Sequence, residues 1–201
     1  MNSIRRNTLG MLSMLGIACL SLSACKRNTP VFNGIDITGA DYGSDFHLTG
    51  QDGKTYSLSQ FKGKYVLLFF GYTQCPDICP TALTRALNIR QQLGADGTQL
   101  QVVFITVDPE RDTPPLLTEY MHAFDPTFLG LFGTTEQTQA VAKAFRVFYK
   151  KVPSGSSYSM DHTAISYLYD TNNKIRLAFK HEQSAEQCAA DIRTLIQTQS
   201  S

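Results

Sequence analysis

The sequence has few of the features that mark several common protein classes. It contains no internal repeat and no low-complexity tract, so repeat and low-complexity architectures are excluded. Its 18 Lys and Arg residues almost balance 17 Asp and Glu residues, which is not the charge of a nucleic-acid-binding protein. With 201 residues, 42% hydrophobic and 17% charged, the chain is typical of one globular domain.

The first 25 residues have the composition of an export signal. Arg5 and Arg6 precede an apolar stretch, which ends in Leu22-Ser-Ala-Cys25. This ending resembles a bacterial lipobox, in which cleavage precedes the cysteine and the cysteine is lipidated. We therefore expect residues 1–24 to be a lipoprotein signal peptide, residues 25–44 a tether lipidated at Cys25, and residues 45–201 the folded domain. An uncleaved anchor or a plain signal peptide is the alternative.

This leader predicts an exported lipoprotein, anchored to a membrane and facing the periplasm. Lys26 follows the lipidated cysteine, and the choice between inner and outer membrane stays open. Cleavage would remove Arg5 and Arg6 and no acidic residue, which leaves the mature chain with a slightly negative net charge. No nucleic-acid partner is therefore expected. The mature domain is expected to be a monomer. Its three cysteines, Cys75, Cys79 and Cys188, are too few for a disulfide scaffold.

The order of expected elements indicates an α/β domain. Strands are predicted at 34–38, 46–49, 54–58, 65–70, 100–107, 128–132, 163–169 and 174–179, and helices at 81–93, 116–124, 136–148 and 184–197. The composition of residues 150–160 predicts a flexible loop. This order predicts a thioredoxin-like three-layer sandwich with a central mixed sheet, helices on both faces and an extra N-terminal β-hairpin.

Two cysteines follow the strongest strand signal in the chain. The run Tyr65–Gly71 is apolar without alternation, as in a central strand covered on both faces. Cys75 and Cys79 come next, and Pro80 fits the first turn of a helix. The unpaired N–H groups and the dipole of a helix N-terminus stabilise anions, so at least one thiol is expected to have a lowered pKa.

The three-residue spacer between these cysteines is one longer than in thioredoxin-type oxidoreductases. It permits a disulfide and equally permits both sulfurs to face one metal ion. His162 precedes a predicted core strand, where thioredoxin-like folds usually place a cis-proline, and no proline stands there. A Cys₂His set prefers Cu(I), with zinc as the competitor, and Asp161 is a candidate to orient the histidine.

The remaining histidines, Cys188 and the charged loop residues are not expected to be metal ligands. His47, His122 and His181 are interpreted as exposed or structural, and Cys188 as a small core residue. Asp77 is either a solvated loop carboxylate or a group that steers a cation or partner. For the polar loop of Asp108, Glu110, Arg111 and Asp112, capping of the next helix is preferred over contact with a partner.

Three motifs together resemble the Sco/SenC family of copper-handling proteins. They are Gly71-Tyr-Thr-Gln-Cys-Pro-Asp-Ile-Cys-Pro80, Val107-Asp-Pro-Glu-Arg-Asp-Thr-Pro114 and Asp161-His162. The resemblance covers residues 45 to 197 and implies copper, as Cu(I) and also Cu(II), held by Cys75, Cys79 and His162. It further implies delivery of copper to, or thiol maintenance of, the binuclear copper centre in subunit II of cytochrome c oxidase. The lipoprotein anchor departs from the transmembrane helix of many members.

The sequence therefore supports one main hypothesis and two alternatives. The main one is a copper chaperone acting on cytochrome c oxidase subunit II or another exported copper or thiol protein, with no catalytic turnover required. The second is a periplasmic thiol-disulfide reductase or redox sensor that cycles Cys75 and Cys79 between dithiol and disulfide. A peroxiredoxin-like peroxidase is a weaker third, because Cys79 would have to resolve a sulfenate from the same loop.

Overall fold

The computed structural model describes residues 30–199. The predicted signal peptide, Cys25 and the first residues of the predicted tether lie outside this range. Within it, none of the helices has the length and apolar character needed to cross a bilayer.

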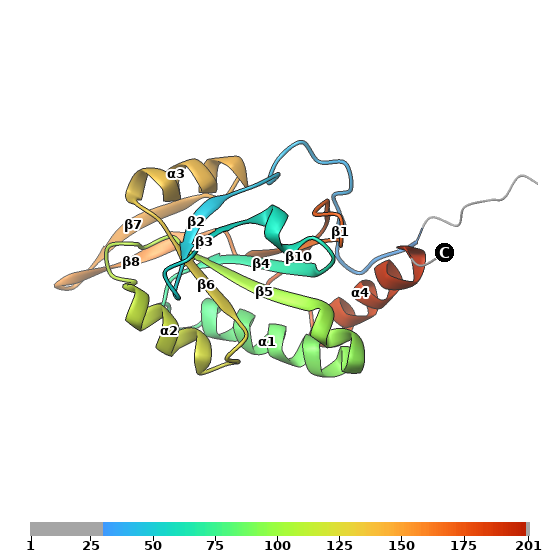
Figure 1. The fold of residues 1–201 in the computed structure, drawn as a ribbon. Helices are drawn as coiled ribbons and strands as arrows, with labels where there is room; N and C mark the ends of the chain where they lie inside the picture. Colours follow the sequence, from blue (N-terminus) through green and yellow to red (C-terminus); the bar gives the residue numbers. More distant parts are fainter. Residues whose placement is uncertain (1–29, 200–201) are drawn as a thin grey trace, which may run out of the picture. The chain divides into compact units, whose positions relative to one another are not determined.

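The described residues form one eight-stranded mixed sheet and a separate two-stranded hairpin (Figure 1). The sheet order is β1 (Ile35–Asp36), β10 (Ile175–Lys180), β9 (Ile165–Tyr169), β4 (Tyr65–Gly71), β5 (Leu100–Thr106), β6 (Leu129–Phe132), β2 (His47–Gly50) and β3 (Thr55–Ser57). Parallel pairs β4–β5 and β5–β6 occupy the centre, and the other pairs are antiparallel. The predicted N-terminal hairpin is β2–β3.

Helices cover both faces of this sheet. On one face lie α1 (Ile78–Leu93), α2 (Pro114–His122) and α4 (Ala185–Gln199), whereas α3 (Thr135–Ala144) lies on the other (Figure 1). Two 3₁₀ helices, Leu58–Phe61 and Gly94–Gln99, complete the elements. Right-handed crossovers carry α1 and α2 to the same side, because β4, β5 and β6 are parallel and consecutive. The predicted thioredoxin-like three-layer sandwich is confirmed.

Strand β4 is the centre of the core, as its composition predicts. All seven of its residues are buried, and β5 and β9 flank it. The parallel register with β5 pairs Gly71 with Thr106, so both chains leave the sheet at the same edge. The loop with the cysteines therefore starts beside the loop that follows β5.

The prediction of a flexible loop at 150–160 is wrong. Strands β7 (Tyr149–Ser154) and β8 (Ser157–His162) form an antiparallel hairpin that is not paired with the main sheet. Gly155, at φ +59°, makes its turn, and Pro153 is tolerated because this small sheet consists only of edge strands. The alternation of Tyr158, Met160 and His162 was the available strand signal, and the turn composition before it masked that signal.

The helix predicted at 136–148 ends earlier, at Ala144. Phe145 follows as the C-cap and Arg146 adopts a left-handed conformation with φ +55°, which stops the helix. Phe148, the last residue of the predicted helix, lies outside it and is 62% exposed. Hydrophobic spacing continued past the end of the helix because Phe145 and Val147 are buried in the irregular segment that follows.

A buried carboxylate attaches the start of the described chain to the last helix. Asp191 of α4 accepts hydrogen bonds from Asn33 N (2.9 Å), Asn33 Nδ2 (2.8 Å) and Gly34 N (2.7 Å). These contacts place β1 against β10, where Ile35 pairs with Ala178. Residues 33–36, inside the predicted tether, thus belong to the packed structure, and the strand predicted at 34–38 is present.

We expect Asp191→Ala to destabilise the protein. The change leaves the donors of Asn33 and Gly34 without their acceptor, and a hydrogen bond to a charged group contributes about 1.5–3 kcal/mol to the free energy of unfolding. Urea unfolding followed by circular dichroism measures the loss. Glu119→Ala, at an exposed carboxylate of α2, is the control, with an expected change of about 0.5 kcal/mol or less. Equal stabilities of the two variants would contradict this role of Asp191.

Candidate metal centre

The two cysteines lie at the junction of β4 and α1, as the sequence predicts. Cys75 is on the connecting loop, and Cys79 is the second residue of the helix. The backbone N–H of Cys79 donates to Cys75 Sγ at 3.4 Å. Both thiols are free, with Cys79 fully buried and Cys75 9% exposed. The helix N-terminus therefore directs a backbone donor at one sulfur.

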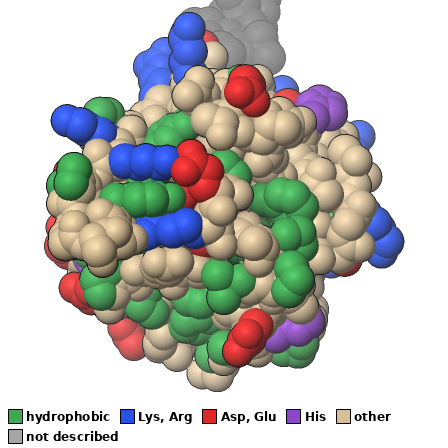
Figure 2. Space-filling model, turned by 90° about the vertical axis from the view of Figure 1, so that its left-hand side faces the viewer, with side chains coloured by type: hydrophobic (Ala, Val, Ile, Leu, Met, Phe, Trp, Pro, Cys, Tyr) green, Lys and Arg blue, Asp and Glu red, His purple; other side chains and the backbone are tan. Residues whose placement is uncertain are grey.

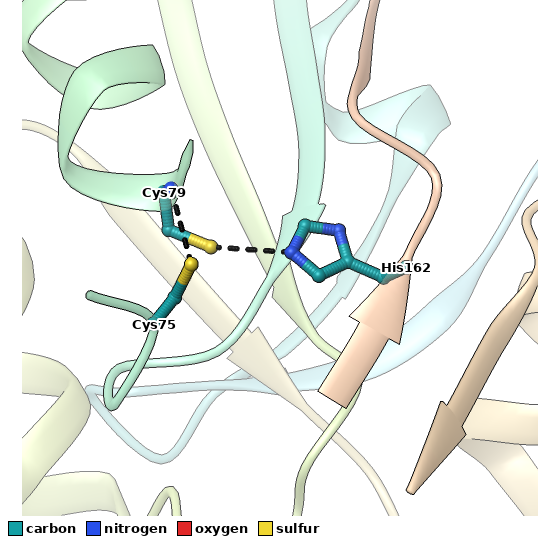
Figure 3. A group of neighbouring side chains, drawn as sticks. All are labelled: Cys75, Cys79 and His162. Carbon is teal, nitrogen blue, oxygen red and sulfur yellow. Dashed lines mark hydrogen bonds between the residues drawn. The ribbon is translucent and has the colours of Figure 1, made fainter. Parts of the chain in front are cut away.

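His162 comes from a different part of the chain and faces the same point. It is the last residue of β8, and its Nε2 lies 3.5 Å from Cys79 Sγ (Figure 3). One ligand atom from each of Cys75, Cys79 and His162 lies within 4.8 Å of the other two. Among the described residues, no other group of His, Cys, Asp or Glu side chains shows such a convergence.

The two thiols differ in their affinity for a proton. Hydrogen bonding from the Cys79 side chain lowers the pKa of Cys75, and His162 and the backbone N–H groups of Asp77 and Cys79 add to this effect. Burial raises the pKa of Cys79, and the neighbouring Cys75 thiolate raises it further. The surroundings therefore favour a thiolate at Cys75 and a neutral thiol at Cys79, in agreement with the prediction that at least one thiol has a lowered pKa.

A backbone contact orients the imidazole of His162. Its Nδ1 lies 3.2 Å from the carbonyl oxygen of Thr163. In the metal-binding form, a proton on Nδ1 donates to that carbonyl and leaves the Nε2 lone pair for a cation, which is the usual arrangement of a metal-binding histidine. The Thr163 carbonyl thus takes the orienting role considered for Asp161, whose exposed carboxylate makes no hydrogen bond to His162 in the described structure.

Aromatic rings and a glycine shape the space around the three ligand atoms. The rings of Phe69 and Tyr72 pack edge-on against His162, each with a centroid distance of 5.9 Å. A Cβ at Gly71 would lie 2.7 Å from Cys79 Sγ and 2.7 Å from Phe104, so this position has no room for a side chain. A pocket of about 350 Å³ opens from Cys75 and His162 to the surface.

The remaining candidates lie away from this centre or serve the fold. His47, His122 and His181 are not part of the converging group. Cys188 is fully buried in α4, and burial raises its pKa to about 11, as expected for a core residue. Asp77 is exposed at the start of α1, where it accepts a hydrogen bond from Thr81 Oγ1 at 3.4 Å.

The capping role preferred for the 108–112 loop is wrong. Thr113 is the N-cap of α2, and no side chain caps that helix. Asp108 and Asp112 are instead 1% exposed and accept hydrogen bonds from the segments that carry the site. The local sequence could not show this, because both sets of donors come from other elements.

Comparisons with known proteins agree on one family. The SCO1/SenC family model matches residues 36–197. A SCO2-like protein of Rickettsia felis is 35% identical over 89% of this chain and 90% of its own. The structure of ScoI from Bradyrhizobium japonicum with copper bound matches with a TM-score of 0.70 and 41% identity, over 76% of this chain and 98% of that one.

A plant structure gives the same result. Arabidopsis thaliana ScoI with copper bound matches with a TM-score of 0.74 and 32% identity, over 78% of this chain and 99% of that chain. The match of the family model spans the cysteine loop, the 108–112 loop and His162 alike. The chain belongs to the SCO1/SenC family.

Proposed function

We propose that the protein is a membrane-tethered copper chaperone. Reduced Cys75 and Cys79 and the imidazole of His162 hold one copper ion, and ligand exchange passes it to the thiolates of a partner. The observation that carries this proposal is the convergence of the three ligand atoms within 4.8 Å. Family membership and the copper-bound relatives support it.

The donor set fits Cu(I) better than zinc. Two thiolates and one imidazole form a soft, three-membered set, and Cu(I) favours soft sulfur ligands. Structural zinc sites are almost always closed by four protein ligands, and the described residues supply three here. Copper binding must also displace the proton of Cys79, whose pKa burial raises, so affinity for Cu(I) rises with pH.

The proposed recipient is the binuclear copper centre in subunit II of cytochrome c oxidase, or another exported copper or thiol protein. Pro76 and Ile78 line the mouth of the pocket and leave its rim partly apolar. The face at the end of the β7–β8 hairpin mixes apolar side chains with neighbouring basic and acidic ones (Figure 2). Such a surface suits a brief contact with another folded protein better than binding to a polyanion.

A thiol-disulfide reductase is the second candidate. The observation that favours it is the pairing of a low-pKa thiol, Cys75, with a neighbouring free thiol, Cys79. A thiolate of this kind attacks a disulfide, and the second thiol then resolves the mixed disulfide. This chemistry does not require the imidazole of His162, which separates the two candidates.

His162→Ala should therefore reduce copper binding and spare thiol chemistry. We expect Cu(I) affinity of the anaerobically reduced protein to fall by at least about a hundredfold, beyond the usual 10- to 100-fold effect of losing an outer partner of a metal ligand. Competition with a chromophoric Cu(I) chelator measures the affinity.

The control for this experiment is His47→Ala, which removes an exposed histidine of β2 and should leave the affinity unchanged. Reduction of a model disulfide is measured on both variants. Unchanged Cu(I) affinity in His162→Ala would remove the chaperone proposal, and a normal rate of disulfide reduction beside it would favour the reductase.

The lowered pKa of Cys75 predicts an unusual pH dependence of alkylation. An ordinary thiol with a pKa near 8.5 loses about tenfold in rate for each pH unit below that value. Because the pKa of Cys75 is held down, its thiolate persists, and the iodoacetamide rate at Cys75 should change little from pH 8 to pH 6. Peptide mass mapping assigns the rate to each cysteine. A tenfold fall per unit at Cys75 would show an ordinary thiol.

We also propose that Cys25 carries the lipid and that the domain faces the periplasm. The support is the Leu22-Ser-Ala-Cys25 sequence after an apolar stretch. Cys25→Ser should abolish incorporation of labelled fatty acid and leave the protein at its precursor mass, whereas Cys188→Ser should change neither. Normal labelling and normal processing in Cys25→Ser would contradict lipidation at this cysteine.

A further inference from the structure

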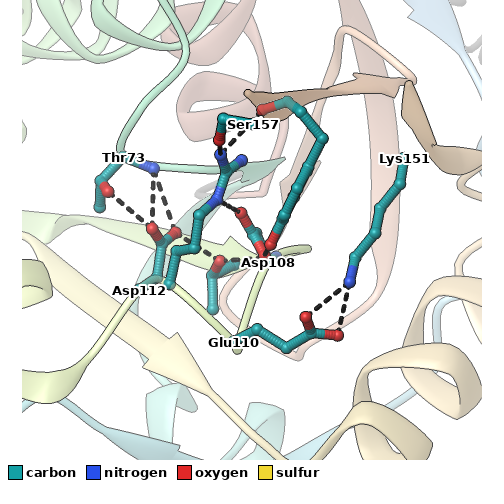
Figure 4. Close-up of polar contacts among 9 residues, drawn as sticks. Thr73, Asp108, Glu110, Asp112, Lys151 and Ser157 are labelled. Atoms are coloured by element: carbon teal, nitrogen blue, oxygen red, sulfur yellow. Dashed lines mark hydrogen bonds and ion pairs between the residues drawn. The ribbon is translucent and has the colours of Figure 1, made fainter. Parts of the chain in front are cut away.

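The loop between β5 and α2 lies between the two segments that supply the candidate ligands (Figure 4). Its residues Asp108, Arg111 and Asp112 contact no ligand atom in the converging group. They bond instead to the chain just before Cys75 and to the strand that ends at His162. The loop is therefore placed to act on the spacing of the ligands.

Asp112 holds the segment before the cysteines. Its carboxylate accepts hydrogen bonds from Thr73 N (3.0 Å) and Thr73 Oγ1 (2.6 Å), and from Thr106 Oγ1 at the end of β5 (2.6 Å). Thr73 lies two residues before Cys75. The carboxylate thus ties the start of the cysteine loop to the end of a core strand.

Asp108 and Arg111 hold the hairpin. Asp108 accepts a hydrogen bond from the Tyr158 hydroxyl at 2.8 Å and forms an ion pair with Arg111 Nε. Arg111 Nη1 donates to the Tyr158 carbonyl at 2.8 Å and to Ser157 Oγ at 3.4 Å. The guanidinium also lies over the Tyr158 ring, 3.7 Å from its centroid. Both ends of Tyr158 are therefore fixed at the start of β8.

The same guanidinium reaches the ring that packs on the histidine. Arg111 Cζ lies 5.8 Å from the centroid of Tyr72, and the Tyr72 ring stands perpendicular to the imidazole of His162. Arg111 Nη2 is buried and has no hydrogen-bond partner in the described structure. Burying an unpaired N–H costs free energy, and the other contacts of the guanidinium must offset that cost. A lysine lacks the flat fork that makes these contacts together.

These side-chain contacts matter because the hairpin is isolated from the main sheet. Strands β7 and β8 pair only with each other, and a lone two-stranded hairpin is marginally stable in water. Backbone pairing with the main sheet begins only at Ile165, three residues after His162. The contacts of Arg111 and Asp108 with Ser157 and Tyr158 hold the start of β8, and the rings of Phe69 and Tyr72 pack on its last residue.

We propose that Arg111 is a positioning residue of the metal centre, which holds the His162 imidazole beside the two cysteine sulfurs through Tyr158, Tyr72 and Asp108. Asp112 does the same for the cysteine loop. The expected effect on Cu(I) affinity rests on the proposed copper function. The expected effect on the mobility of the β7–β8 hairpin concerns the metal-free protein alone.

The test compares Arg111→Met and Arg111→Lys with a matched control. Glu110→Gln is that control, because the Glu110 carboxylate accepts two 2.6 Å contacts from Lys151 Nζ, which joins the same loop to the same hairpin at an exposed site. Two quantities are measured on the full chain: Cu(I) affinity by chelator competition, and amide hydrogen exchange of residues 157–163 in the metal-free protein.

Arg111→Met should lower Cu(I) affinity by about 10- to 100-fold, the range for partners that orient metal ligands. Exchange at residues 157–163 should accelerate while β4 and β5 stay protected. Arg111→Lys should behave like Arg111→Met, because lysine lacks the planar guanidinium even though it keeps the charge. Glu110→Gln should match the unchanged protein. Tyr158→Phe, which removes only the hydroxyl bonded to Asp108, should give a smaller change in the same direction.

Several results would overturn the inference. They are unchanged exchange at 157–163 in Arg111→Met, equal effects of Arg111→Met and Glu110→Gln, or full affinity in Arg111→Lys. If Arg111→Met loses protection throughout the core, Tyr158→Phe decides, and its failure to change exchange at 157–163 refutes the positioning role. If the unchanged protein binds no Cu(I), the proposed function fails. Faster amide exchange of the hairpin in Arg111→Met would still show that Arg111 holds the hairpin in place.

Discussion

The parallel register of β4 with β5 is the constraint on which the site depends. It aligns Gly71 with Thr106, so the cysteine loop and the 108–112 loop leave the sheet side by side. The antiparallel register of β4 with β9 pairs Phe69 with Ser166, and His162 precedes β9 by a short segment. Three parts of the chain therefore meet at one edge of the sheet, as the crossover rules for α/β sheets require of strand ends.

Burial at that edge separates the properties of two chemically identical thiols. Cys79 is fully buried beside Gly71 and Phe104, so it keeps its proton, while Cys75 receives hydrogen bonds that favour its thiolate. One negative charge is less costly to hold there than two. A soft cation offsets the cost of a second thiolate, at Cys79. Because burial keeps Cys79 protonated without a cation, metal binding is accompanied by release of the Cys79 proton.

Patterns that depend on local composition were predicted well. The apolar run of β4, its flanking strand β5 and helix α1 with Pro80 in its first turn were all expected, because a strand buried on both faces and a helix start have clear local signals. The converging residues Cys75, Cys79 and His162 were also named from the sequence. That inference needed the resemblance and the missing proline, since a histidine before a strand carries little information alone.

Features that depend on distant partners were not predicted. The β7–β8 hairpin read as a loop because Pro153 and Gly155 dominate its composition, and the side chains that fix it come from Asp108 and Arg111. The capping role assigned to the 108–112 loop failed for the same reason. Local propensity describes what a segment can form, whereas these two segments are ordered by their contact with each other.

The ligand set is consequently divided between a rigid part and a less rigid part. Cys79 belongs to a helix packed on the core, and Cys75 is held by the helix terminus and, through Thr73, by Asp112. His162 belongs to a hairpin joined to the body by side chains, without backbone pairing to the main sheet. Contacts of this kind open with less free energy than a core strand. The fold thus places two of the three candidate ligands on or beside the packed core, and it leaves the position of the third to side-chain contacts.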